Sequence, residues 1–194
     1  MILINIILDK SGSMGIIAGE VVGMVNKFLS DQKEVAGEAE VSLIQFDNIY
    51  EENYIGKPIK WCEDLVNGKT YVPRGMTALY DAIGRTINTV KVSEKEFDNV
   101  LFVIITDGEE NASKEFTNTM IKEMIGNKPE NWDFIFLAAG IDASLEASKI
   151  GIMQSKCASF SSNARGITGM CATMSDYTTN YRMTGDTNMK VDKK

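Results

Sequence analysis

Three nearly continuous apolar runs place the strongest constraint on how this chain can fold. They occupy residues 2–8, 100–105 and 134–138, and segments with helical periodicity separate them. Strands that are apolar on both faces are typical of a parallel sheet covered by helices on each side. The sequence therefore predicts an α/β protein with a doubly wound, mostly parallel sheet.

The remaining segments complete an expected sheet of about six strands with helices on both faces. Two further parallel strands are predicted at 41–46 and 156–160, and 49–55 is expected to run antiparallel at the edge after an Asp47-Asn48 turn. Residues 56–76 contain two of the three prolines and are predicted to be an irregular connection.

Apolar residues at intervals of three and four predict the helices. Ser113 or Thr117 is expected to cap the third helix, and Ser162 or Asn163 the last. Residues 1–183 are assigned to one domain, and 184–194 to a polar C-terminal tail. The predicted helices are 16–29, 78–92, 116–125, 144–150 and 163–181.

The first apolar run ends in a pentapeptide rich in oxygen donors, Asp9-Lys10-Ser11-Gly12-Ser13. Asp9, Ser11 and Ser13 occupy alternate positions, and Gly12 allows a tight bend. One carboxylate and two hydroxyls form a hard, weakly charged ligand set, which suits Mg²⁺ or Mn²⁺ better than zinc or copper. The alternative is that Ser11 or Ser13 only caps the following helix.

Two distant segments carry matching side chains. Residues 75–83 place Thr77 after a glycine turn at the start of a helix, and residues 100–108 place Asp107 at the end of an apolar strand. Parallel strands end on the same edge of a sheet, where such folds bind their ligands. Asp9 and Asp107 are therefore expected at the same rim.

Together these motifs, Asp-x-Ser-x-Ser, Gly-x-Thr-Ala-Leu and Ile-Thr-Asp-Gly, resemble the metal-ion-dependent adhesion site (MIDAS) of von Willebrand factor type A (vWA) domains. The resemblance covers most of the chain. It implies that hydroxyls of the serines and the threonine bind the metal, and that the aspartates act directly or through water. The implied metal ligands are Asp9, Ser11, Ser13, Thr77 and Asp107.

The same resemblance implies a function. In the family, a carboxylate from a partner protein fills the remaining coordination position, so we expect a partner that offers Asp or Glu to the metal. Standalone cytoplasmic members occur in bacteria and their phages, commonly as adaptors in multi-protein assemblies that include ATPase partners. Specificity is expected from the surrounding loops, which are residues 10–16, 47–49, 67–76, 108–115 and 139–144.

Most catalytic alternatives are excluded by residue type. The chain contains no histidine, which removes Ser-His-Asp triads and nearly all zinc hydrolases. Gly68-Lys69-Thr70 lacks the preceding glycine of a P-loop, because Glu63 stands there. A Mg²⁺-dependent phosphoester hydrolase using Asp9 remains the alternative, although Ser11 occupies the position of its general acid. The chain is therefore predicted to be a binding module and not an enzyme.

Composition bears on partners and location. The net charge of −7 and pI of about 4.8 argue against nucleic acid or an anionic membrane as partner. Lys10, Lys69 and Arg74 are candidates for a basic rim around the site, although Lys10 is expected to point to solvent. Glu109 and Glu110 are interpreted as a solvated turn. Three cysteines, no secretory signal and no run of membrane-spanning length predict a cytoplasmic protein.

Overall fold

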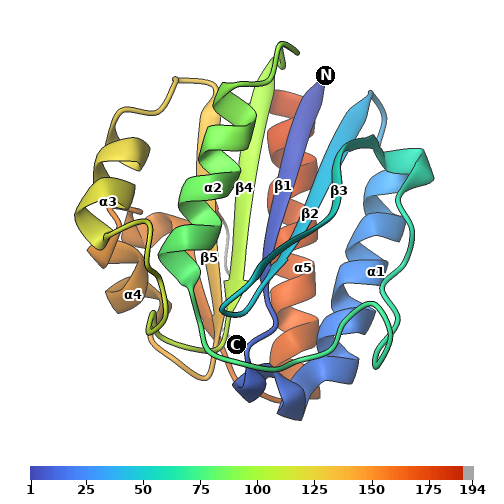
Figure 1. Ribbon diagram of the computed structural model, residues 1–194. Helices are drawn as coiled ribbons and strands as arrows, with labels where there is room; N and C mark the ends of the chain where they lie inside the picture. Colours follow the sequence, from blue (N-terminus) through green and yellow to red (C-terminus); the bar gives the residue numbers. More distant parts are fainter. Residues whose placement is uncertain (190–194) are drawn as a thin grey trace.

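A single six-stranded sheet lies between two layers of helices in the computed structural model, which describes residues 1–189 (Figure 1). The strand order is β3-β2-β1-β4-β5-β6, and every neighbouring pair is parallel except β2–β3. The predicted mixed sheet with one antiparallel edge strand is therefore confirmed. The strands are β1 (Ile2–Asp9), β2 (Ala39–Phe46), β3 (Tyr50–Pro58), β4 (Asn99–Thr106), β5 (Trp132–Ala139) and β6 (Cys157–Phe160).

Helices cover both faces of this sheet, as expected for a doubly wound fold. α1 and α5 pack together on one face, and α2, α3 and α4 lie on the other (Figure 1). The helices are α1 (Ala18–Glu34), α2 (Leu79–Lys91), α3 (Asn118–Gly126), α4 (Ala143–Lys149) and α5 (Ala164–Thr184), with short 3-10 turns η1 (Gly12–Ile17), η2 (Ile59–Trp61) and η3 (Gln154–Lys156).

The element boundaries differ from the sequence prediction by more than two residues in three places. The helix expected over 16–29 begins as the 3-10 turn η1 and continues as α1 to Glu34. β3 extends to Pro58, so the first residues of the predicted irregular connection are strand. α5 runs to Thr184 and ends at Gly185, whose φ of 71° closes the helix, so the predicted tail begins within the last helical turn. Residues 190–194 of that tail lie outside the described residues.

Two caps expected from the sequence are confirmed. The side chain of Thr117 accepts a hydrogen bond from the Met120 amide at the start of α3. Asn163 accepts one from the Gly166 amide at the start of α5. Each cap satisfies an amide that has no partner within its helix, and so fixes where the helix begins.

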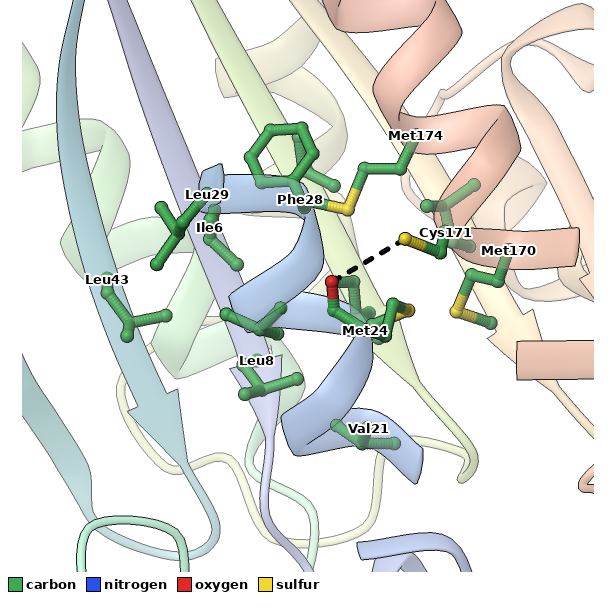
Figure 2. Packing of buried hydrophobic residues seen from close by; sticks show 14 of the residues in the cluster. Ile6, Leu8, Val21, Met24, Phe28, Leu29, Leu43, Met170, Cys171 and Met174 are labelled. Atoms are coloured by element: carbon green, nitrogen blue, oxygen red, sulfur yellow. Dashed lines mark hydrogen bonds between the residues drawn. The ribbon is translucent and has the colours of Figure 1, made fainter. Parts of the chain in front are cut away.

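The face between the sheet and the α1–α5 pair is rich in sulfur (Figure 2). Met24, Met170 and Met174 are buried there, and the Cys171 thiol lies 3.6 Å from the carbonyl oxygen of Met24. Flexible methionine side chains fill the irregular gap between the two crossing helices. These methionines are core residues, as their helical spacing predicts.

No helix within residues 1–189 combines the length and the apolar character needed to cross a bilayer.

Two helical glycines provide a matched test of this packing. A Cβ at Gly84 in α2 would lie 2.5 Å from the Phe116 ring, whereas a Cβ at Gly23 in α1 would meet nothing within 4 Å. We expect Gly23→Ala to stabilise the fold by about 1 kcal/mol through helix propensity. Gly84→Ala is expected to destabilise the fold by about 1 kcal/mol, because the cost of overpacking against the Phe116 ring exceeds the gain in helix propensity. Denaturant unfolding measures both, and stabilisation by both would contradict the close packing of α2.

Candidate metal centre

The carboxyl ends of β1 and β4 bring the two predicted aspartates to the same rim of the sheet. β1 and β4 are adjacent and parallel, with Leu8 opposite Ile105. Asp9 is the last residue of β1, and Asp107 follows directly after β4. The chain after each strand turns at this rim, which is the edge to which the strand arrows of β1 and β4 point in Figure 1.

Asp9 lies at the bottom of this site and is fully buried. Its Oδ1 accepts the Ser11 amide at 2.6 Å, and its Oδ2 accepts the Thr106 hydroxyl at 2.6 Å. The Tyr71 hydroxyl donates to its backbone carbonyl at 2.7 Å. Both carboxylate oxygens are therefore held in place by the chain itself.

The serine hydroxyls link Asp9's loop to Asp107. Ser11 Oγ and Ser13 Oγ are 3.2 Å apart, and the Ser13 hydroxyl donates to Asp107 Oδ1 at 2.6 Å. Ser11 is buried, whereas Ser13 is exposed and Asp107 is half-buried. The site therefore deepens from an open side at Ser13 to a closed floor at Asp9. Neither serine caps α1, because Ser11 precedes η1, Ser13 lies within it, and Ile17 is the residue before α1.

Thr77 reaches the same place from a third segment. Its amide donates to Asn111 Oδ1 at 2.8 Å, and its carbonyl accepts the Asn111 amide at 3.0 Å. A Cβ at Gly108 would lie 3.2 Å from Thr77 Oγ1 and 3.9 Å from Ser13 Oγ, so both hydroxyls face the same glycine. All five predicted side chains are thus gathered at one rim, and their role as metal ligands stays a prediction.

A turn at Gly75 places Thr77. Gly75 has a φ of 69°, a conformation that side chains rarely adopt, and a Cβ there would collide with Asn48 Oδ1. The Gly12 amide donates to the Gly75 carbonyl at 3.2 Å, so the two glycine turns of the site contact each other. The glycine turn expected before Thr77 is therefore observed.

Four charged side chains tie the loops behind the site together. Lys10 is buried, and its Nζ lies 2.5 Å from Glu51 Oε2 on β3. Arg74 pairs with Asp47 at 3.0 Å and with Glu51 at 2.6 Å. The expectation that Lys10 points to solvent is wrong, because Glu51 provides a counter-charge for the buried ammonium. Lys10 and Arg74 consequently do not form a free basic rim, whereas Lys69 is exposed.

The segment after Asp107 is also more ordered than expected. Glu110 accepts the amides of Tyr80, Ala112 and Ser113, at 2.9, 2.8 and 2.6 Å. The interpretation of Glu110 as a solvated residue is therefore wrong: its carboxylate caps the start of α2 and closes its own loop. Only the neighbouring Glu109 is exposed.

Asp81 connects α2 to the loop that follows β4. Its carboxylate in the first turn of α2 accepts the amides of Lys114, Glu115 and Phe116, each at 2.9 Å. These bonds fasten the loop after β4 to α2 and so to Thr77. Sequence spacing gives no signal for such contacts, because the partners are more than 30 residues apart.

Burial dominates the electrostatics of the two aspartates. It raises the pKa of Asp9 to about 6, against the opposing effect of hydrogen bonds from Thr106 and Ser11, and the charge of Asp107 adds to the rise. Burial also raises the pKa of Asp107, while the bond from Ser13 opposes it. Burial therefore disfavours the charged form of both carboxylates, and a cation bound beside them would favour it.

The donor set fits a hard divalent cation. Two carboxylates and three hydroxyls offer only oxygen, the ligand type that Mg²⁺ and Mn²⁺ prefer. The part of the chain that the structure describes contains no group of three or more His, Cys, Asp or Glu side chains able to hold a metal. A site at this rim would therefore depend on its hydroxyls as well as its carboxylates.

Comparison with known proteins identifies the fold class. Neither a family model nor a curated protein matches the sequence. Among solved structures, proximal thread matrix protein 1 from the mussel byssus, with a zinc-occupied MIDAS motif, superposes with a TM-score of 0.68 at 12% identity over 92% of this chain and 46% of that one. The ArnB paralogue VWA2 of Sulfolobus acidocaldarius gives 0.61 at 17% identity over 91% and 44%.

BatB of Bacteroides thetaiotaomicron is similar over nearly its whole length, with a TM-score of 0.59 at 11% identity over 91% of this chain and 98% of that one. The chain therefore has the α/β fold of a vWA domain. The likeness at these identities extends to the fold alone. The chain spans less than half the length of the mussel and Sulfolobus proteins.

The burial of Asp9 predicts a particular pH dependence of the metal-free protein. A pKa raised from 3.8 to about 6 means that the folded state binds the proton more tightly, so stability falls as pH rises from about 4 to about 6. Asp9→Asn removes this ionisation. In EDTA, the variant is expected to be more stable than the wild type by up to about 3 kcal/mol at pH 7, with the difference shrinking towards pH 4. Urea unfolding across this range measures it, and a difference independent of pH would contradict the buried carboxylate.

Proposed function

We propose that this protein is a Mg²⁺-dependent protein-binding module, an adaptor that captures an acidic side chain of a partner at a metal-ion-dependent adhesion site. One observation carries the proposal: two carboxylates and three hydroxyls from three separate segments meet at one rim of a vWA fold. The side chains that would hold the metal are Asp9, Ser11, Ser13, Thr77 and Asp107.

The five predicted ligands have different roles on the closed and the open side of the site. Asp9 supplies buried negative charge, and Thr106 keeps its carboxylate oriented. Ser13 and Asp107 lie at the accessible side, where a partner can approach. A bound Mg²⁺ or Mn²⁺ would supply the positive charge that a partner's Asp or Glu seeks. Few anionic groups of the module would surround this cation, so it would keep most of its positive charge. The partner's carboxylate therefore gains more from it than from a cation that the module had already neutralised.

The same geometry disfavours the hydrolase alternative. An aspartyl-phosphate mechanism needs a carboxylate oxygen that can reach the substrate. Both oxygens of Asp9 are engaged, one by the Ser11 amide and one by Thr106, and the residue is fully buried. A nucleophile must reach the substrate directly, whereas Asp9 can hold a metal ion through bound water. Ser11 stands where such an enzyme places its general acid. We therefore propose that the protein is not an enzyme.

The cellular setting belongs to the same proposal. We propose a cytoplasmic adaptor of bacterial or phage type that acts within an assembly that includes an ATPase, which is the setting that the family resemblance implies. Nucleic acid and membrane surfaces are unsuitable partners for a chain of net charge −7. The assembly itself is identified by the partner that the site retains.

Metal binding is expected to raise the melting temperature. At a Mg²⁺ or Mn²⁺ concentration 100-fold above its Kd, one site adds about 2.7 kcal/mol, or roughly 5–10 °C for a domain of this size. Asp9→Ala and Thr77→Val should each abolish most of the rise, since each removes one ligand. Asp31→Ala serves as the matched control, because this partly exposed aspartate of α1 pairs with Lys27 and lies outside the predicted ligand set. An unchanged melting curve for the wild type would contradict the site.

Partner capture tests the binding function directly. A lysate of the source cell is passed over the immobilised protein in Mg²⁺ and in EDTA, beside Thr77→Val and Asp31→Ala. We expect a partner retained by the wild type and Asp31→Ala in Mg²⁺ only. Retention that ignores both metal and Thr77 would show that this rim is not the interface. Metal-dependent turnover of phosphate esters, lost with Asp9→Ala, would favour the hydrolase instead.

A further inference from the structure

Large apolar side chains stand exposed around the candidate metal centre. Ile16 is 86% exposed, Met76 54% and Ile49 51%. Ile16 lies on η1 three residues after Ser13, and Met76 directly precedes Thr77. Ile49 follows the Asp47-Asn48 turn. Exposed apolar side chains grouped in this way are typical of interaction surfaces.

Hydrogen bonds join the three loops that carry these residues. The Gly12 amide bonds to the Gly75 carbonyl at 3.2 Å, joining the loop of Ile16 to that of Met76. The Met76 amide lies 3.4 Å from Asn48 Oδ1, which joins the loop of Met76 to that of Ile49. We name Ile16, Ile49 and Met76 the apolar rim.

The charged residues of these loops cannot receive additional acids. Residues 10–17, 47–50 and 73–77 contain two cations, Lys10 and Arg74, and both are paired with Glu51 or Asp47. The exposed cations Lys69 and Lys114 stand in the adjoining segments 67–72 and 108–115. The chain as a whole carries a charge of −7. A partner with a run of acidic residues would therefore find no unpaired cation in the three loops that carry the apolar rim.

We infer that the partner presents a single Asp or Glu flanked by apolar side chains, which pack on the apolar rim while the carboxylate enters the metal site. This inference rests on the proposed function and names the kind of partner that the site selects. The metal contributes the attraction for the one carboxylate. The partner's apolar side chains are buried against the apolar rim, which stabilises this complex more than a complex with an acidic tract.

Selection from a displayed library of random linear peptides tests the inference. Peptides are bound to the wild-type protein in Mg²⁺ and eluted with EDTA. We expect enriched sequences to contain one Asp or Glu with Leu, Ile, Val, Met or Phe within two positions. Enrichment of acidic runs without apolar neighbours would overturn the inference and leave the metal-dependent capture intact. Absence of any EDTA-eluted peptide from a protein that Mn²⁺ still stabilises would overturn it as well.

Paired variants locate the effect on the apolar rim. Ile16→Ser and Met76→Ser should each weaken binding of an enriched peptide about tenfold, while the metal-induced rise in melting temperature persists. Val92→Ser and Met183→Ser are the matched controls, since these side chains are 79% and 59% exposed where α2 and α5 end, at the edge away from the site. Equal affinity in rim and control variants would overturn the inference. If Thr77→Val loses both peptide and metal binding while the rim variants bind the peptide normally, the proposed function stands and the inference about the apolar rim fails.

Discussion

The burial of the Asp9 carboxylate at the end of β1 is the constraint on which the rest of the site depends. A carboxylate removed from water requires donors or a cation in its place. The Ser11 amide and the Thr106 hydroxyl satisfy its two oxygens, and they come from the loop after β1 and from the neighbouring strand β4. Satisfying Asp9 therefore fixes the loop geometry that brings Ser11 and Ser13 towards Asp107.

The sequence was sufficient for the architecture and for the gathering of the five side chains. Apolar runs that end in Asp9 and Asp107 require adjacent strand ends in a parallel sheet, and a turn glycine such as Gly75 marks the third segment. The partners of Lys10 and Glu110 could not be predicted in the same way. Each contacts a distant element, Glu51 on β3 for Lys10 and the Tyr80 amide of α2 for Glu110, and no sequence periodicity predicts such contacts.

These unpredicted contacts change the character of the rim. A basic surface around the metal position was expected to help an acidic chain attract an acidic partner. Because Glu51 and Asp47 pair with Lys10 and Arg74, these cations connect the loops to each other and to β3. Exposed apolar side chains, among them Ile16 and Met76, also stand at the rim, and we propose that they contact the partner.

The most direct measurement is a crystal structure of the protein grown in Mn²⁺, with anomalous data collected to locate the ion. The account predicts one strong anomalous peak within coordination distance of Ser11 Oγ, Ser13 Oγ and Thr77 Oγ1, with Asp9 and Asp107 beside it. A peak elsewhere on the surface, or none at this rim at saturating Mn²⁺, would contradict it.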